Sequence, residues 1–188
     1  MRAARRHCAW IASGIAAAMV CGGIAAGVAR ARTQRPITFD GSCQFSGRVK
    51  FRPGLSNSPR TVYQSVSAPG TCDGTLRDRH GFTHKLNRVR VTFSESSVGR
   101  NASCAEGIAT GGGNLRFHWG KLRFAFTERR VGAFVTGTAT GARGGSATGY
   151  GAPSSSENPV RLVQECGGGG ISQARVDIHM STTPDISG

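Results

Sequence analysis

The segment Arg77–His84 holds the densest group of side chains that could bind a metal ion. Asp78, His80 and His84 offer a carboxylate and two imidazoles, which are ordinary zinc ligands. Gly81 predicts a loop between the two histidines, so their four-residue spacing does not align the rings on a helix face. A zinc site would also need a further protein ligand in a fixed position and neighbouring groups that orient the ligating side chains. We expect a solvated hairpin tip here and keep the three residues as candidate metal ligands only as the alternative. No motif predicts a bound cofactor.

Hydrolytic chemistry has little support in the motifs. The segment nearest to a serine nucleophile motif is Gly170–Ala174, centred on Ser172. It lies in a glycine-rich connection with no helix after it, whereas a nucleophile elbow needs a strand-to-helix turn to expose the serine. The acidic residues are scattered, and Glu128 stands at an expected turn, so no spaced carboxylate pair predicts glycosidase chemistry. We name no catalytic residue, and a secreted hydrolase is the last of three functional hypotheses.

Basic residues recur on the polar face of the expected strands. Five of them would form one outer surface if their strands are neighbours: Arg48, Lys50, Arg52, Arg88 and Arg90. Such a face would attract anionic cell-wall polymers or lipid headgroups. The aromatic residues fall on the opposite, inward parity, which argues against a stacking platform for single-stranded nucleic acid. A diffuse excess of arginine without a functional patch is the alternative.

The first 31 residues have the order of a secretory signal peptide. Arginines precede an apolar stretch at 9–28, which we expect to form a signal helix, and Ala29 and Ala31 supply the small residues that signal peptidase accepts. Cleavage after Ala31 would lower the formal net charge from +14 to +10, because four arginines and no acidic residue leave. An uncleaved anchor is the alternative, since a spanning helix needs about 20 apolar residues. We expect export, and a mature chain without a transmembrane segment.

Six cysteines are present, and two of them leave with residues 1–31. The other four are Cys43, Cys72, Cys104 and Cys166, an even number that favours two disulfides in an exported chain. Local geometry favours Cys43–Cys72, because antiparallel strands folded about residues 57–58 would place the two cysteines opposite each other. Cys104–Cys166 follows by elimination. Two disulfides predict an oxidising compartment, extracellular or in the cell envelope.

Alternation of apolar and polar residues is the repeated pattern from residue 32 onward. In residues 43–52, Cys43, Phe45 and Val49 share one face, and Arg48 and Lys50 share the other. Short turns separate about eight or nine such segments, which predicts an all-β antiparallel meander closed as a barrel, with a two-sheet sandwich as the alternative. We expect one domain over residues 32–180 and a polar tail over 181–188. Residues 153–159 are expected to form a surface loop, and 160–163 and 174–180 the last strands.

The clearest hairpin pattern lies between Leu115 and Phe126. Apolar residues occupy odd positions up to Trp119 and even positions from Leu122 onward. A two-residue turn at positions 120–121 would place Trp119 opposite Leu122 and direct all of these side chains into one core. A bulge at Gly120 is the alternative.

Four segments combine cysteines in strands with glycines at turns: residues 41–47 (GSCQFSG), 70–76 (GTCDGTL), 103–107 (SCAEG) and 111–117 (GGGNLRF). In these segments the chain resembles an uncharacterised family of secreted β-rich proteins from high-GC Gram-positive bacteria. The resemblance covers most of the chain after residue 31. It implies an exported β-domain with no assigned activity, and it transfers no catalytic or binding residues to this chain.

These observations predict an exported, non-enzymatic β-domain that serves as a binding or structural module outside the cell or in its envelope. Its basic outer face would bind an anionic surface. The alternative is a carrier of a small apolar ligand, whose site in the barrel would be lined by residues such as Phe45, Phe117, Trp119 and Phe124. A hollow interior of roughly a few hundred Å³ would favour the carrier, and a fully packed interior would exclude it.

Overall fold

Eight strands follow one another in residues 35–188, the part of the chain that the computed structural model describes. The expected signal peptide, residues 1–31, lies outside this part. The strands are β1 (Thr38–Leu55), β2 (Arg60–Arg77), β3 (Thr83–Ala102), β4 (Glu106–Phe117), β5 (Gly120–Val131), β6 (Phe134–Gly141), β7 (Gly144–Pro153) and β8 (Ile171–Ser187).

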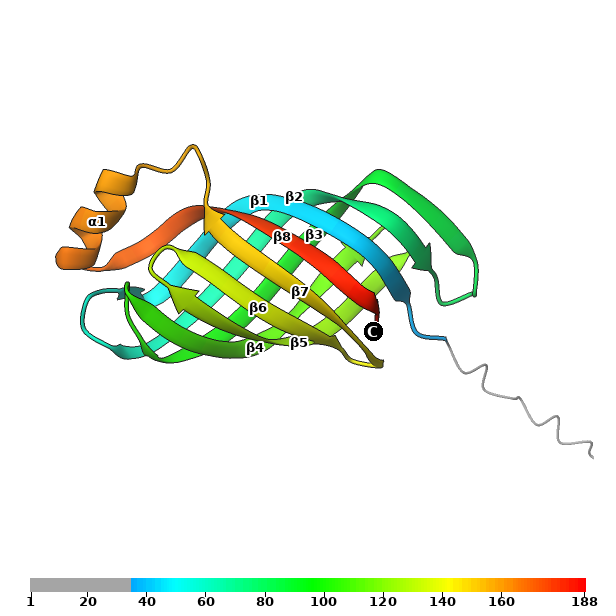
Figure 1. Ribbon diagram of the computed structural model, residues 1–188, viewed down its shortest axis with the longest axis horizontal. Helices are drawn as coiled ribbons and strands as arrows, with labels where there is room; N and C mark the ends of the chain where they lie inside the picture. Colours follow the sequence, from blue (N-terminus) through cyan, green and yellow to red (C-terminus); the bar gives the residue numbers. More distant parts are fainter. Residues whose placement is uncertain (1–34) are drawn as a thin grey trace, which may run out of the picture. The chain divides into compact units, whose positions relative to one another are not determined.

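Each strand pairs antiparallel with the next, and β8 pairs with β1, so the sheet closes into a barrel (Figure 1). Closure gives both edge strands of the meander a hydrogen-bonding partner, which removes the exposed edges that an open sheet would carry. The predicted antiparallel barrel is therefore confirmed, and the two-sheet sandwich is wrong.

The barrel interior follows the alternation of the sequence. In β1, Phe39, Cys43, Phe45, Val49 and Phe51 are all buried, and most of the residues between them are exposed. Successive side chains of a strand point to opposite faces, so this pattern places one face in the core and the other in solvent.

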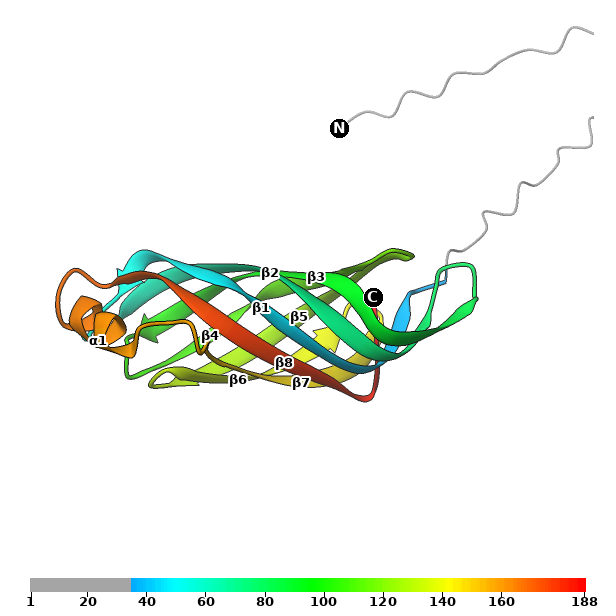
Figure 2. The ribbon, with the colours of Figure 1, turned by 90° about the horizontal axis from the view of Figure 1, so that it is seen from above.

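The turns gather at two ends of the barrel, which Figure 2 shows at opposite sides of the view. The packed end carries the turns at residues 78–82, 118–119 and 142–143. Its core includes the fully buried side chains Phe39, Leu76, Leu115, Leu122 and Ile186. The helix end carries the turns at 56–59, 103–105 and 132–133 and the connection at 154–170.

A short helix, α1 (Pro159–Gly167), interrupts the connection between β7 and β8. The prediction of a strand at 160–163 is therefore wrong, and β8 begins at Ile171. The side chain of Asn158 caps the helix by accepting hydrogen bonds from the backbone amides of Val160 and Arg161, and Pro159 stands in the first turn. None of the nine residues of α1 is buried, so the helix needs other attachments to stay in place.

The end of β8 replaces the expected polar tail. The strand continues to Ser187, which pairs with Thr38, and Ile186 is fully buried. Residues 181–187 belong to the barrel because they supply the last hydrogen bonds that join β8 to β1 and β7. The prediction of a tail at 181–188 is wrong.

The β4–β5 hairpin has the predicted inward face but a different register. The turn lies at residues 118–119, so Phe117 pairs with Gly120 and Leu115 with Leu122. The predicted pairing of Trp119 with Leu122 is wrong. The shift is an even number of residues, so the apolar side chains still point inward. Trp119 leaves the hairpin core and is only partly buried.

Both predicted disulfides are supported. Cys43 and Cys72 stand directly opposite each other on β1 and β2, with their Cα atoms 4.1 Å apart, inside the barrel. Cys104 and Cys166 join the β3–β4 turn to α1, with their Cα atoms 6.2 Å apart. Two disulfides fit an oxidising, extracellular environment. Within residues 35–188, no helix is long and apolar enough to span a membrane.

Candidate functional site

A cavity of about 450 Å³ lies inside the barrel toward the helix end. Strands β1, β3 and β5 line it with large apolar side chains, among them Phe51, Leu55, Phe93, Phe124 and Phe126. Pockets for small molecules usually measure about 300–1,000 Å³ and have a mostly apolar lining. The cavity therefore has the size and surface of a small-molecule site.

The small residues of β6 and β7 explain why this part of the barrel is hollow. The inward positions of these strands that line the cavity include Gly137, Ala139, Ala147, Gly149 and Gly151. An eight-stranded barrel is just wide enough for its side chains to fill it or for one small ligand. Because most of these inward positions carry little side-chain volume, the large residues of the opposite wall face empty space.

A layer of phenylalanine rings separates the cavity from the packed end. The ring of Phe93 lies 5.1 Å from that of Phe45 and 6.0 Å from that of Phe124, measured between centroids. Phe124 lies over the backbone of Gly113, where a Cβ atom would come 2.5 Å from the ring. Glycine at position 113 is therefore what lets the Phe124 ring occupy this layer.

Four polar side chains face the cavity among these apolar residues: Gln64, Glu95, Glu128 and Arg130, here called the polar cluster. The amide of Gln64 on β2 donates a hydrogen bond to the carboxylate of Glu128 on β5. The guanidinium of Arg130 lies 5.2 Å from the centroid of the Phe51 ring, a cation–π distance. Glu95, on β3, is close enough to Glu128 for the two carboxylates to repel each other.

Burial changes the acidity of the polar cluster. It raises the pKa of Glu95 to about 8, and the negative charge of Glu128 adds to the effect. Burial also raises the pKa of Glu128, against the opposing influence of the Gln64 hydrogen bond and of Arg130. At neutral pH, Glu95 is therefore mostly protonated and can donate a hydrogen bond into the cavity. When ionised, it can pair with a cation.

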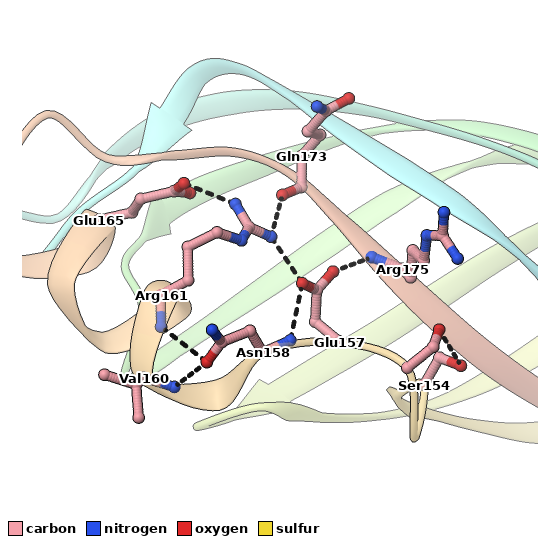
Figure 3. Close-up of polar contacts among 9 residues, drawn as sticks. Ser154, Glu157, Asn158, Val160, Arg161, Glu165, Gln173 and Arg175 are labelled. Atoms are coloured by element: carbon pink, nitrogen blue, oxygen red, sulfur yellow. Dashed lines mark hydrogen bonds and ion pairs between the residues drawn. The ribbon is translucent and has the colours of Figure 1, made fainter.

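Helix α1 lies at the mouth of the cavity. Leu162, Val163 and Cys166 contribute to its lining, and the Cys104–Cys166 disulfide holds the helix to the β3–β4 turn. Figure 3 shows a second attachment, in which Arg161 lies between Glu157 and Glu165.

Glu157 links this ion-pair group to the barrel. Its carboxylate lies 2.7 Å from the Arg161 guanidinium and also accepts a hydrogen bond from the backbone amide of Arg175 on β8 (Figure 3). The hydrogen bond from Arg161 is the main cause of a lowered pKa at Glu157. The helix is thus fixed at both ends, by a disulfide and by hydrogen bonds.

The metal candidates form a structural turn. One carboxylate oxygen of Asp78 accepts hydrogen bonds from the backbone amides of His80 (2.8 Å) and Phe82 (3.0 Å), and the other lies 3.0 Å from His84 Nε2. The His84 ring stacks on Trp119 at 4.3 Å. The hydrogen bond from His84 is the main cause of a lowered pKa at Asp78.

These contacts leave little for a metal ion to bind. Asp78 is buried, whereas Arg79, His80 and Phe82 at the tip of the hairpin are exposed, so only Asp78 departs from the solvated tip that the sequence suggested. His80 takes part in these contacts through its backbone amide, which donates a hydrogen bond to Asp78. Within residues 35–188, no three His, Cys, Asp or Glu side chains are placed to hold a metal.

The five basic residues are exposed as predicted but form two groups. Arg48, Lys50 and Arg52 lie on β1, and Arg88 and Arg90 lie on β3; β2 pairs with both strands and separates them. The condition for one continuous face, that the strands are neighbours, is therefore not met.

The group on β1 has a further member that sequence reasoning missed. Arg48 stands directly opposite Arg175 of β8, and both side chains are exposed. Like charges at directly opposed positions of a sheet repel each other. The outer surface around Arg48 and Lys50 also forms a shallow trough with Ser65, Ser67 and other serines.

The residues proposed for an interior ligand site need correction. Of the four named, only Phe124 lines the cavity; Phe45 and Phe117 are buried beyond it, and Trp119 stacks on His84. Glu128 does not stand at a turn but inside β5, facing inward.

The polar cluster itself was missed, although the strand alternation contains the signal. Continuing the inward parity of Leu122 and Phe124 leads to Glu128 and Arg130, and that of Phe93 leads to Glu95. The sequence spacing of the acidic residues did not show that Glu95 and Glu128 come close enough inside the barrel to influence each other.

Fold and site together define a closed eight-stranded antiparallel β-barrel with an apolar interior cavity and a small, partly buried polar cluster. Compared with family models, with curated proteins and with solved structures, the chain matches none of them. The resemblance to secreted β-rich proteins of high-GC Gram-positive bacteria therefore stays a prediction.

Proposed function

We propose that this protein binds a small apolar ligand inside its barrel and carries it outside the cell. The cavity of about 450 Å³ is the observation that carries the proposal. Its aromatic lining offers a ligand a surface removed from water, where each Å² of buried apolar area contributes roughly 25 cal/mol before the costs of association. The disulfide that holds α1 at the mouth keeps the site in one arrangement.

A variant that fills the cavity tests the proposal. Ala139 is buried on the inner face of β6, and the next residue, Thr140, is exposed on the outer face. We expect Ala139→Trp to abolish the fluorescence increase of the uncharged probe N-phenyl-1-naphthylamine, whereas Thr140→Trp keeps it. Ala139→Leu should weaken probe binding less, and it serves if the larger residue prevents folding. Equal probe binding by the folded Ala139 variants and the wild type would refute an interior site.

Export belongs to the same proposal. The order of charged, apolar and small residues in 1–31 and the two disulfides both support it. Expression in a secreting bacterial host should release a chain that begins at Arg32, with both disulfides formed. Intact mass before and after reduction and alkylation measures both properties. A chain that stays in the membrane with residues 1–31 attached would support the anchor instead.

A second candidate function rests on the outer surface. Arg48, Lys50 and Arg175 place three positive charges close together, and the repulsion between the opposed arginines would decrease if an anion bound there. We propose that this surface retains the protein on anionic cell-wall polymer or lipid headgroups. It is compatible with a carrier that works close to the envelope.

Salt dependence tests this second function. We expect retention on purified anionic wall polymer to fall between low and high salt, because salt screens exposed charges. Arg48→Ser combined with Arg175→Ser should reduce retention more than Arg88→Ser combined with Arg90→Ser, which removes the same charge from β3. Retention that is independent of salt, or equal losses in the two double variants, would contradict a site on β1 and β8.

A further inference from the structure

The carboxyl group of Glu95 is the one member of the polar cluster whose charge is left uncompensated. Glu128 accepts a hydrogen bond from Gln64 and has Arg130 nearby, and Arg130 lies over the Phe51 ring. Among residues 35–188, no hydrogen bond or ion pair reaches the Glu95 side chain, and its charged neighbour is another carboxylate. A carboxyl group in this position costs free energy when ionised unless something that enters the cavity pairs with it.

The charges around the cavity favour a cationic partner. When Glu95 is ionised, the polar cluster carries two negative charges and one positive charge. A ligand carboxylate near Arg130 would also lie near Glu128, which already neutralises that arginine, so the added charge would be repelled. An ammonium group near Glu95 would instead bring the cluster to neutrality.

We propose that the cavity binds an apolar molecule that carries a single amine, with its hydrocarbon part among Phe51, Phe93 and Phe126 and its ammonium group on Glu95. This inference rests on the proposed interior ligand site and specifies its ligand class. The apolar lining would bind the body of the ligand, and Glu95 would select its head group. The alcohol and the carboxylic acid of the same chain length are the competitors that Glu95 would disfavour.

Nearby, Ser97 is a second polar side chain without a partner. It follows Glu95 by two positions on the inner face of β3 and pairs in register with Gln64. It is buried, and within the described residues its hydroxyl makes no hydrogen bond. Two adjacent inward positions of β3 thus hold polar groups whose bonding capacity the barrel itself does not use.

Binding of an ammonium group would release a proton from the protein. The free site holds Glu95 as a neutral acid at pH 7, because its pKa is raised to about 8. The ammonium displaces this proton to solvent and leaves an ion pair between the carboxylate and the cation. Amine affinity should therefore rise by roughly 50-fold between pH 6 and pH 8 and then level off.

The other ionisable residues that line the cavity differ in their position relative to Glu95. Glu128 and Arg130 on β5 face Glu95, while β2 contributes the uncharged Gln64 and β4 contributes glycines at the facing positions. Tyr150 on β7 and His179 on β8 also belong to the lining, but their rings stack on each other 4.6 Å apart and Tyr150 is exposed. The expected pH dependence therefore belongs to Glu95 and its coupling with Glu128.

Calorimetric titration of the full chain with octylamine, octan-1-ol and octanoate tests the inference. At pH 8 we expect octylamine to bind at least about tenfold more tightly than octanol, and octanoate to bind most weakly. Titration at pH 7 in buffers of different ionisation enthalpy should show about one proton released for the amine and none for the alcohol. Equal affinities for amine and alcohol, or tightest binding of octanoate, would overturn the inference.

Glu95→Gln separates the head-group site from the cavity. Glutamine resembles the neutral acid, so the variant should fold, bind octanol as the wild type does, and lose both the amine preference and the proton release. Glu106→Gln removes the same charge from an exposed position and should change neither. Amine preference that persists in Glu95→Gln would assign the cation to another group. If none of the three ligands binds the wild type, the proposed interior site itself fails, which is a different result from a lost amine preference.

Discussion

At the packed end of the barrel, side chains such as Phe39, Leu76 and Leu115 are fully buried in the interior, whereas at the helix end large residues face a cavity of about 450 Å³. The same antiparallel strands run through both ends. The difference arises on one wall, where β6 and β7 contribute glycine and alanine at the inward positions of the helix end. A barrel with the same strands throughout can thus be filled by side chains at one end and enclose a cavity at the other.

The two ends also treat carboxyl groups in opposite ways. At the packed end, Asp78 receives hydrogen bonds from His84 and from two backbone amides, and these lower its pKa. At the helix end, Glu95 faces apolar residues and another carboxylate, and its pKa rises to about 8. The packed end therefore stabilises a charge as part of the structure. The helix end holds a group that is stabilised only when it is neutral or paired with a cation.

The largest expected effect is the pH dependence of stability at Glu95. Between pH 4.5 and pH 8 the unfolded chain releases this proton while the folded chain keeps it, so the free energy of unfolding falls as the pH rises. In the wild type, the free energy of unfolding should fall by up to about 5 kcal/mol across this window, since one pKa unit corresponds to about 1.4 kcal/mol. Glu95→Gln should abolish this fall. Urea unfolding of both proteins from pH 5 to pH 8.5 measures it. Parallel pH curves for the two proteins would show that Glu95 is not held neutral.

The two disulfides should differ in their effect on the cavity more than in their effect on stability. They join residues 29 and 62 positions apart, for which loop entropy gives about 4 kcal/mol in either case. Cys43→Ala with Cys72→Ala and Cys104→Ala with Cys166→Ala should therefore cost similar amounts. The second pair alone releases α1 from the mouth, so it should speed the exchange of bound probe in stopped-flow measurements. Faster exchange in the first pair as well would mean that α1 does not control entry.

Truncating one leucine at each end of the barrel compares the packing of the two ends directly. Leu122 is fully buried at the packed end, and Leu55 is buried but lines the cavity. We expect Leu122→Ala to lower the free energy of unfolding by about 3–5 kcal/mol and Leu55→Ala by about 2 kcal/mol, because Leu55 already lacks neighbours on one side. Chemical unfolding of the two variants decides this. Equal losses would indicate that the helix end is as tightly packed as the other.

The smallest expected effect concerns Arg161, which ties α1 to Glu157 and Glu165. Arg161→Ala should change the free energy of unfolding by less than about 0.5 kcal/mol, because partly exposed ion pairs contribute little. Amide hydrogen exchange in α1 should nevertheless become faster, while exchange in β5 stays the same. Unchanged exchange in the helix would show that the Cys104–Cys166 disulfide alone holds it.

Much of the architecture could be predicted because it depends on local pattern. Alternation along each strand identified the inward faces correctly, even in β4 and β5, where the turn lies at residues 118–119 and not at 120–121. The Cys43–Cys72 pair followed from the position of the turn midway between the two residues. Helix α1 was missed because it is only nine residues long, although Asn158 and Pro159 mark its start.

By itself, the sequence determined which side chains point inward, which cysteines face each other on β1 and β2, and that the strands follow one another as a meander. Only the tertiary structure decided that the meander closes through β8, that one end is hollow, and that Glu95 and Glu128 meet inside it. The physical reason is the distance along the sequence over which each property is determined. The direction of a side chain is set by its neighbours along the strand. A cavity is the volume left over when residues from all eight strands, far apart in sequence, are brought around one axis.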